Sequence, residues 1–178
     1  MKITVYLLLV VVLIGCGDSI TELIIESYSK GNPKIIHFIS GKDSVQIIHK
    51  KISLKENGDT LSIQYGDSLK VEMTYYKSDT LKTVSKYLHS KKSGEWKYFH
   101  DNGEIDCRLF YKKDIIDSTY QEFYSNGKKA ITGLYSNGIR EGQWKFYDSD
   151  GELTGDYKYL KGDVYYSSGY YIDLEYGD

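Results

Sequence analysis

The amino-acid sequence predicts an all-β fold, in which tandem β-hairpin repeats of 24 residues form an elongated, single-layer antiparallel meander. Three observations lead to this fold class. The 178 residues include 19 tyrosines and 17 glycines but 1 proline, a composition typical of strands joined by tight turns. No Ala/Leu/Glu-rich stretch with helical periodicity follows residue 30. The segment GEWKYFHDNGE at residues 94–104 returns as GQWKFYDSDGE at residues 142–152.

Residues 1–15 have the pattern of a secretory signal peptide. Lys2 precedes an unbroken apolar run from Val5 to Ile14, and Gly15 follows. That run is shorter than the roughly 20 residues with which a helix spans a bilayer. It matches the hydrophobic core of a signal peptide instead. An uncleaved anchor, or an ordinary signal peptide followed by Cys16 by chance, is the alternative.

Cys16 is the predicted lipid-attachment residue. The stretch from Leu13 to Cys16, LIGC, resembles a bacterial lipobox. The resemblance implies that the thiol is acylated and that the leader is cut before Cys16. Two or three acyl chains then anchor the protein stably. Residues 16–24 would be the lipidated N-terminus and tether of a protein in the bacterial cell envelope, with the choice of inner or outer membrane left open.

The numbers of charged residues and of cysteines argue against several kinds of partner and against a disulfide. Lys and Arg number 23 against 25 Asp and Glu, a formal charge of −2. This mild acidity argues against nucleic acid and against electrostatic docking on anionic lipid. An acylated Cys16 cannot pair with Cys107, so we expect no structural disulfide. Cys107 is then best interpreted as a small buried hydrophobe.

A 24-residue register connects three copies of one unit. The middle copy is STYQEFYSNGK, at residues 118–128. Self-similarity of this kind is the signature of repeat proteins. The columns that hold the period are Trp96, Tyr120 and Trp144; Phe99, Phe123 and Tyr147; Gly103, Gly127 and Gly151; Tyr111, Tyr135 and Tyr159; and Asp114, Gly138 and Gly162.

Each unit carries two turn signals, which predict two strands per repeat. The Asn102-Gly103 type of dipeptide accepts positive φ at both central positions of a two-residue hairpin turn. The second signal, represented by Lys113-Asp114, is weaker. The full sets are Asn102-Gly103, Asn126-Gly127 and Asp150-Gly151 for the first signal, and Lys113-Asp114, Asn137-Gly138 and Lys161-Gly162 for the second.

A two-residue turn at Asn102-Gly103 would fix the strand register. It would pair Tyr98 with Cys107 and Trp96 with Leu109, whereas a three-residue loop with a bulge would shift these pairs. In the later copies the predicted pairs are Tyr120 with Gly133 and Phe146 with Gly155. An aromatic ring lying over a glycine covers backbone that would otherwise be bare.

The clear repeats occupy residues 94–165. We interpret residues 25–93 as degenerate β-hairpin copies of the same unit, with a distinct N-terminal β module as the alternative. Asp79 stands in the Gly103 column and Tyr87 in the Tyr111 column, for example. Residues 166–178 are the predicted C-terminal cap, because an end repeat must present a face that tolerates water.

The repeated pattern G-x-W-x-[YF]-[FY]-x-x-[DN]-G, followed by an aromatic residue and a turn, resembles the MORN repeat. It is most similar to the variant found in tandem in bacterial proteins, many of them labelled YwqK-type antitoxins. Tyr120 in a Trp column and Asp114 in a Gly column depart from the pattern. The resemblance implies a sheet of hairpins that serves as a binding or scaffolding surface.

Two short motifs suggest chemistry, and each has a simpler interpretation. Gly66-Asp67-Ser68-Leu69 matches the nucleophile block of GDSL esterases, but no helical pattern follows and none of the four histidines lies in the last 78 residues. A turn between strands explains it. The run from Asp148 to Glu152 could begin a calcium loop, yet Tyr159 stands where the bidentate Glu is needed.

These observations predict a non-catalytic protein without metal or cofactor. We expect it to act as a lipid-anchored protein-binding or scaffolding module, with no small-molecule substrate; an antitoxin or immunity protein that neutralises one toxin is the alternative. The partner is an unidentified protein. The aromatic residues that would either bind it or pack the repeats together are Trp96, Tyr98, Tyr120, Trp144 and Phe146.

Overall fold

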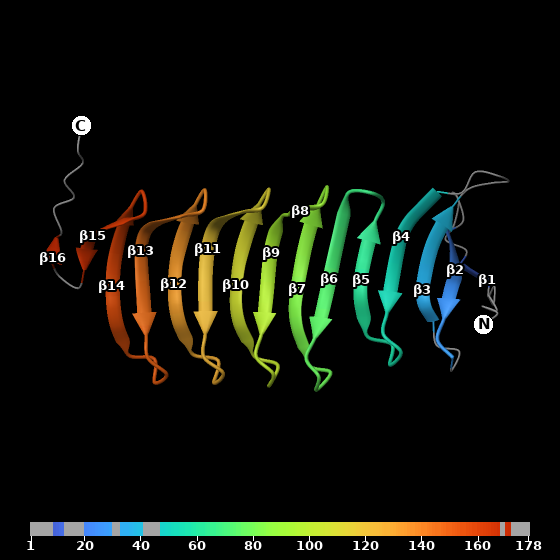
Figure 1. Cartoon of the computed structure of the whole chain (residues 1–178), viewed down its shortest axis with the longest axis horizontal. Helices are drawn as coiled ribbons and strands as arrows, with labels where there is room; N and C mark the ends of the chain where they lie inside the picture. The colour runs from blue at the N-terminus through green and yellow to red at the C-terminus, as the bar shows by residue number, and fades with distance from the viewer. Residues whose placement is uncertain (1–8, 13–19, 30–32, 41–46, 168–169, 172–178) are drawn as a thin grey trace. The chain divides into compact units, whose positions relative to one another are not determined.

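The structure, a computed structural model, is built from β-strands (Figure 1). It describes residues 9–12, 20–29, 33–40, 47–167 and 170–171. Within these ranges every regular element is a strand. Successive strands pair antiparallel through short turns, in a sheet that does not close on itself. The predicted fold class, an all-β meander of hairpins, is confirmed.

The chain forms two compact units. The first contains residues 1–73 and 87–90, and the second contains residues 74–86 and 91–178. In the first unit each strand pairs with its neighbour in the chain. The strands that begin there are β1 (Leu9–Val12), β2 (Ile20–Ser27), β3 (Pro33–Ser40), β4 (Ile47–Leu54), β5 (Thr60–Tyr65) and β6 (Leu69–Tyr75).

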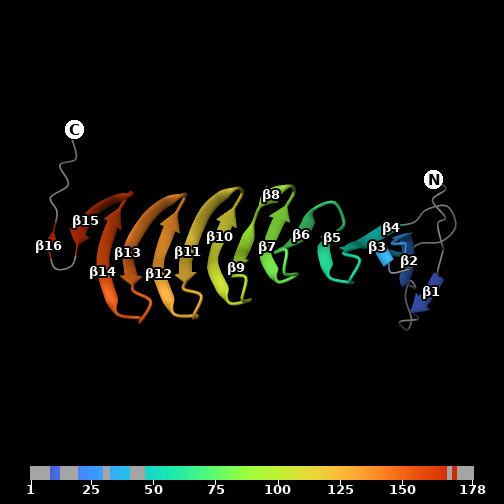
Figure 2. The same cartoon turned by 60° about the horizontal axis from the view of Figure 1, so that its bottom comes forward.

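The second unit contains the clear repeats. From β9 to β14 its strands curve together in one layer, with no second layer drawn over them (Figure 2). Two strands make one repeat. The strands are β7 (Leu81–Leu88), the short β8 (Lys91–Lys92), β9 (Gly94–Phe99), β10 (Ile105–Lys112), β11 (Ile115–Phe123), β12 (Lys129–Ser136), β13 (Ile139–Tyr147), β14 (Leu153–Leu160), β15 (Asp163–Ser167) and β16 (Tyr170–Tyr171).

The Asn-Gly turns differ from the predicted two-residue type. The N–H of His100 donates to the carbonyl of Glu104 at 2.8 Å, and the N–H of Gly103 donates to the carbonyl of His100 at 2.9 Å. Gly103 has φ 89°, whereas Asn102 is not among the residues with positive φ. The loop is therefore longer and has one left-handed residue, a glycine. The same two hydrogen bonds form at Tyr124 and Asp148.

The true two-residue turns lie at the other ends of the strands. Lys112 pairs directly with Ile115, and both intervening residues, Lys113 and Asp114, have positive φ. This is the geometry of a type I′ turn, whose twist matches that of the flanking strands. The signal that looked weaker in the sequence thus marks the tighter turn. The φ values are 52° and 72° for Lys113 and Asp114, 50° and 85° for Asn137 and Gly138, and 53° and 97° for Lys161 and Gly162.

The predicted register is correct even though the turn type is not. Trp96 pairs with Leu109 and Tyr98 with Cys107. The register shifts between Ile105 and Cys107, and this bulge absorbs the extra residue of the longer turn. The other predicted pairs also form, namely Tyr120 with Gly133 and Phe146 with Gly155.

Two turns upstream of the clear repeats have the same hydrogen bonds. The N–H of Lys55 donates to the carbonyl of Asp59 at 2.7 Å, and that of Tyr76 donates to Thr80 at 2.8 Å. Asp79, in the Gly103 column, has φ 66°. This shared geometry supports the interpretation of residues 25–93 as degenerate copies, which stays a prediction.

The two chain ends are only partly described. Leu9–Val12 forms β1 and pairs with β2, while Cys16 and most of the predicted leader lie outside the described residues. Of the predicted cap, residues 166–167 and 170–171 are described, where β15 pairs with β16. In the part of the chain that the structure describes, no helix is long and apolar enough to cross a membrane.

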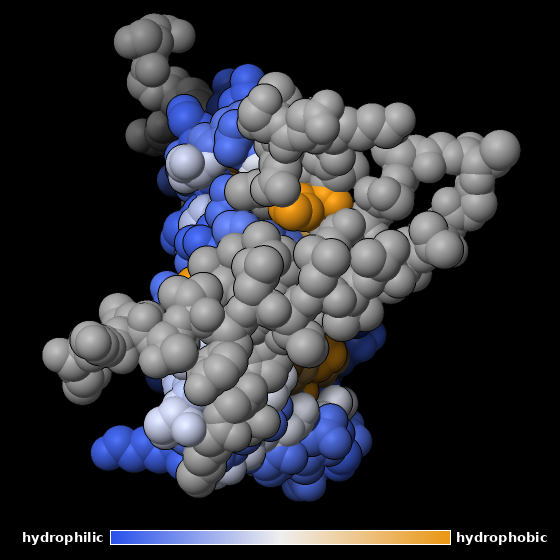
Figure 3. Space-filling view, turned by 90° about the vertical axis from the view of Figure 1, so that its right-hand side faces the viewer, coloured by the Kyte–Doolittle hydropathy of each residue, from blue (hydrophilic) through white to orange (hydrophobic). Residues whose placement is uncertain are grey.

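A single layer of sheet buries few side chains completely. Among the coloured atoms on the side of the molecule shown in Figure 3, hydrophilic surface predominates over a few hydrophobic areas. Most described strand residues are half-buried, so both faces of the sheet remain accessible in part. Among the described residues, the buried apolar side chains are Ile39, Trp96, Leu109, Ala130 and Trp144.

Candidate protein-binding surface

One face of the second unit, here called the tryptophan face, carries Trp96 and Trp144. Trp144 has no exposed surface and Trp96 is 6% exposed. Each indole N–H donates to a backbone carbonyl, Trp96 to Lys86 at 2.9 Å and Trp144 to Leu134 at 3.1 Å. A tryptophan that is buried and whose N–H has a hydrogen-bond acceptor is a packing side chain. The predicted aromatics Tyr98, Tyr120 and Phe146 lie on this same face and are half-buried.

Other side chains of the chain itself surround Trp144. The Tyr120 ring stacks on it at 5.6 Å between centroids, and the Tyr135 ring meets it edge-on at 5.0 Å. The guanidinium carbon of Arg140 lies 4.4 Å from the indole centroid, which is within cation–π range. The ring surfaces are therefore occupied internally, which leaves little of Trp144 on which a ligand could stack.

Part of this arrangement returns two repeats earlier. Tyr111 meets Trp96 edge-on at 5.0 Å, as its counterpart Tyr159 meets Trp144 at 6.1 Å, and the Lys92 ammonium lies 4.7 Å from the Trp96 centroid. Lys92 and Arg140 stand in one column of the 24-residue register, and Ile116 fills that column in the middle copy. The cation thus accompanies Trp and is replaced by an apolar residue where Tyr120 replaces Trp.

Gly133 makes the close packing of Trp144 feasible. A Cβ atom built on Gly133 would overlap the Trp144 ring. The sequence predicted that an aromatic side chain would cover this glycine, with Tyr120 as its direct cross-strand partner. Tyr120 does pair with Gly133, but the covering ring comes from the strand on the other side.

Cys107 belongs to a small polar group on the tryptophan face. Burial raises the pKa of its thiol to about 11. The Tyr120 hydroxyl donates to the Glu122 carboxylate at 2.8 Å, and burial followed by this hydrogen bond raises the Tyr120 pKa as well. Both groups therefore stay protonated at neutral pH, so neither is poised to act as a nucleophile or base.

The opposite side of the sheet, here called the polar face, remains half-exposed. Successive cross-strand pairs align one long row of side chains on it. The row carries three cations, one carboxylate and two uncharged polar groups. Its members are Lys97, Arg108, Gln121, Thr132, Lys145 and Asp156.

Arg108 is the best-defined member of that row. Its Nε donates to the Gln121 side chain at 2.5 Å, and its guanidinium carbon lies 5.5 Å from the Phe123 ring centroid. Phe123 belongs to the aromatic column with Phe99 and Tyr147, and all three are half-buried. Arg and aromatic side chains are enriched in protein interfaces.

Exposed apolar side chains gather near the type I′ ends of these strands. Ile115, Leu134, Ile139 and Leu160 are between 40% and 49% exposed. The Ile115 side chain lies next to Gly138, and that of Ile139 next to Gly162, so each isoleucine approaches the turn of the following repeat. Apolar groups beside charged and aromatic ones are the composition of a docking surface.

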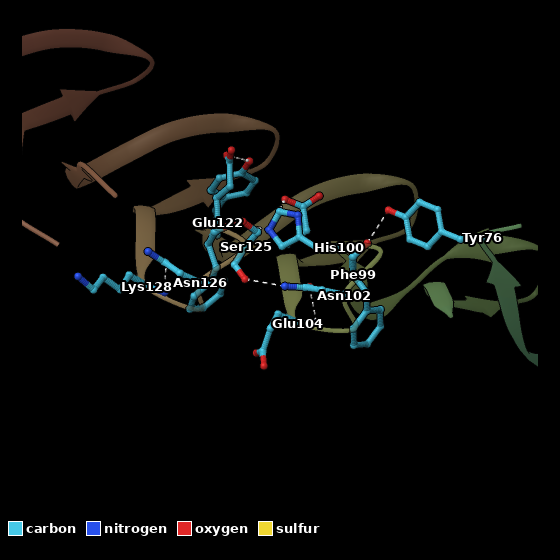
Figure 4. Close-up of polar contacts among 12 residues, drawn as sticks. Tyr76, Phe99, His100, Asn102, Glu104, Glu122, Ser125, Asn126 and Lys128 are labelled. Carbon is cyan, nitrogen blue, oxygen red and sulfur yellow. Dashed lines mark hydrogen bonds and ion pairs between the residues drawn. The ribbon is translucent and has the colours of Figure 1, made fainter. Parts of the chain in front are cut away.

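The Asn-Gly turns carry a hydrogen-bond ladder that the sequence analysis missed (Figure 4). The Tyr76 hydroxyl donates to the Phe99 carbonyl at 2.7 Å, and the Tyr124 hydroxyl donates to the Tyr147 carbonyl at 2.8 Å. In the copy between them the His100 ring nitrogen lies 2.9 Å from the Phe123 carbonyl. We call Tyr76, His100 and Tyr124 the turn ladder.

A signal for the turn ladder was present in the sequence. Its three residues stand 24 apart, in a column that mixes tyrosine with histidine. A second line of bonds runs beside it, from Asn102 to the Ser125 carbonyl at 2.7 Å and from Asn126 to the Ser149 carbonyl at 2.9 Å. Each asparagine therefore does more than begin a turn: it also binds the next repeat.

The GDSL block and the run from Asp148 to Glu152 both lie at turns between strands. β6 begins at Leu69, directly after Ser68, so a strand and not a helix follows the GDSL block. Asp148 Oδ1 accepts the N–H of Asp150 at 3.0 Å and that of Glu152 at 2.9 Å, which makes it a cap of its own turn. Among the described residues, no group of three or more His, Cys, Asp or Glu could hold a metal ion.

No protein-family model matches the chain, and no curated protein matches it.

Proposed function

We propose that this chain is a lipid-anchored repeat protein of the bacterial cell envelope, similar to MORN-repeat proteins, and that it binds other proteins without catalysing a reaction. The observation that carries the proposal is the contrast between the two faces of the second unit. The tryptophan face buries Trp96 and Trp144 and uses their rings internally, whereas none of the charged and aromatic residues named on the polar face is buried. We infer that the polar face is the docking surface.

The composition of the polar face favours a protein partner. Lys97, Arg108 and Lys145 lie in one row with Asp156, so no single sign of charge dominates. A strong attraction for a polyanion would need a basic patch. Arg108 over Phe123, with exposed apolar groups nearby, resembles the mixture found in protein interfaces instead.

An antitoxin or immunity role is the second candidate, and the resemblance to antitoxin-labelled repeats favours it. A cleaved leader would place such a protein outside the cytoplasm. It could then neutralise only an incoming or envelope-acting toxin.

The lipid anchor is tested by Cys16→Ser in the full chain. Without the thiol there is no acylation, so the variant should leave the membrane fraction, as judged by fractionation and by the mass of the N-terminus. A variant that stays fully membrane-bound and unprocessed would refute the lipobox. Wild-type protein that carries no acyl chain would refute the anchor.

The docking surface is tested by affinity capture of the full chain from its own cells and medium. Arg108→Ala with Lys145→Ala removes two cations from the polar face. Lys113→Ala with Lys161→Ala removes two cations from the type I′ turns and is the matched control. We expect one stoichiometric partner, lost only in the first double variant. If that partner is a toxin that the protein silences, the immunity role is supported; capture that is equal in both double variants would contradict the proposed surface.

A further inference from the structure

The first unit has a polar row of its own on one face of its sheet. Direct cross-strand pairs join His37 on β3 to Lys51 on β4, Lys51 to Gln64 on β5, and Gln64 to Lys70 on β6. Such pairs place their side chains on the same face. Four strands at about 4.8 Å spacing give the row a length of about 14 Å.

This face is hollowed along the row. One cavity of about 420 Å³ is lined by residues that include Gln64, Asp67, Ser68, Tyr87 and Ser90. A second, of about 210 Å³, is lined by His37, Lys51, Gln64, Gly66 and Asp67. Because Gln64 and Asp67 border both, the cavities adjoin each other. The larger one is within the size range of small-ligand sites.

The charges around the two cavities cancel. Lys70 and Glu72, both in the lining of the larger cavity, form an ion pair at 2.5 Å. Lys51 and Asp67 contribute one charge of each sign to the smaller one. Neither an anion nor a cation is favoured by such a lining. The other polar groups are the Gln64 amide and the hydroxyls of Ser68 and Ser90, which can accept and, through N–H or O–H, donate hydrogen bonds.

His37 supplies the observation that points to a ligand. Its Nε2 is shielded from solvent and has no hydrogen-bond partner among the residues that the structure describes. Burial, and then the neighbouring Lys51, lowers the pKa of the imidazole. The ring is therefore neutral at pH 7. A nitrogen that is shielded from solvent and forms no hydrogen bond destabilises the folded state, unless another group forms a hydrogen bond with it.

We propose that this face of the first unit binds a neutral, hydroxyl-rich glycan lying across β3 to β6. A hydroxyl can donate to or accept from the His37 ring, whichever tautomer is present, and it can do the same with Gln64 and the two serines. The zero net charge of the lining fits a ligand without charge. The length of the row suits an oligosaccharide better than one sugar, and the Tyr87 ring offers an apolar surface to the carbon side of a sugar ring.

The test is isothermal titration of the full chain in detergent with two neutral probes, the trimer of N-acetylglucosamine and maltotriose. Trialanine, a zwitterion, and triglutamate, an anion, are the comparison ligands. The variants are Gln64→Ala and His37→Phe. The matched control is Ser53→Ala, which lies on the same strand as Lys51 and does not line either cavity. Urea midpoints show whether each variant is folded.

We expect saturable binding of at least one neutral trisaccharide. Both cavity variants should weaken it by about tenfold or more, as loss of a buried polar contact does, while Ser53→Ala leaves it unchanged. Absence of binding by both trisaccharides overturns the proposal. So does equal binding by wild type and a folded Gln64→Ala variant, or a preference for trialanine or triglutamate. The titration does not depend on any protein partner, so its failure leaves the proposed function untouched.

Discussion

Ser118 stands at a position that the flanking copies fill with glycine. Its φ is 76°, against 76° for Gly94 and 65° for Gly142. A side chain in this left-handed region is strained, because Cβ approaches the backbone carbonyl. Ser118 is exposed, so the backbone and not packing decides the residue that fits best.

Ser118→Gly should therefore stabilise the protein. Relief of the left-handed strain outweighs the extra freedom that glycine gives the unfolded chain, and we expect a gain of about 0.5–1 kcal/mol in the free energy of unfolding. Urea denaturation measures it. Ser118→Ala keeps a Cβ and is the control, with no comparable gain. A lower urea midpoint for the glycine variant would show that the serine hydroxyl compensates for the strain.

Cys107 was expected from the sequence to be a buried hydrophobe, and the structure gives its environment a chemical consequence. It is a free thiol, half-buried, beside Tyr120. Because burial disfavours the thiolate, the pKa is raised from 9.0 to about 11. Sequence alone could not predict this shift, since it depends on how far a single layer shields the sulfur.

Cys107 should react slowly with Ellman's reagent at pH 8. The thiolate fraction at that pH is about a hundredfold below that of an ordinary thiol, and its rate rises as the pH approaches 11. Cys16→Ser removes the other thiol from the measurement. Unfolding in urea is expected to restore the ordinary rate; equal rates for folded and unfolded protein would mean that the thiol is accessible and unperturbed.

At the scale of strands and turns, the sequence predicted the pairs but gave the two-residue type to the Asn-Gly turns, which are the longer ones. Asn-Gly is compatible with a type I′ turn and also with a longer loop that ends in a left-handed glycine. In the longer loop the Glu104 N–H donates to Asn102 Oδ1 at 3.0 Å, and contacts with the next repeat run from Asn102 to Ser125 and from Tyr76 to Phe99. Such long-range bonds cannot be predicted from the Asn-Gly dipeptide alone. The bulge after each loop restored the register, which is why the predicted pairs still hold.

Each tyrosine hydroxyl of the turn ladder should make its own contribution to the free energy of unfolding. Tyr124→Phe removes the donor to the Tyr147 carbonyl and should cost about 0.5–1.5 kcal/mol, the usual net value of such a bond. Tyr147→Phe removes a hydroxyl from the polar face and serves as the control, with a change near zero. Both are compared by urea unfolding. Equal losses in the two variants would argue against the ladder.

For the whole molecule, the sequence left open whether the tryptophans pack or bind. The answer depended on the rings and cations that surround them, which come from several strands. Trp144 contacts Tyr120, Tyr135 and Arg140, and Gly133 lies beneath it. The half-exposed row on the opposite face depends on pairs between several strands, so no single repeat shows that Lys97, Arg108 and Lys145 align.

Trp144→Ala should destabilise the second unit far more than Lys145→Ala. Truncation of a buried Trp typically costs about 3–5 kcal/mol, whereas a half-exposed Lys costs about 0.5 kcal/mol or less. Thermal and urea unfolding give both values. Equal small effects, with partner binding lost only in the Trp144 variant, would reverse the roles of the two faces.

The most direct test of the central claim is site-specific photocrosslinking in living cells. A photoreactive phenylalanine analogue is placed at Thr132, on the polar face, and in a second strain at Ser149, in an Asn-Gly-type turn. Docking on the polar face predicts one discrete crosslinked partner from position 132 and none from position 149. The same partner from both positions, or from position 149 alone, would contradict docking on the polar face.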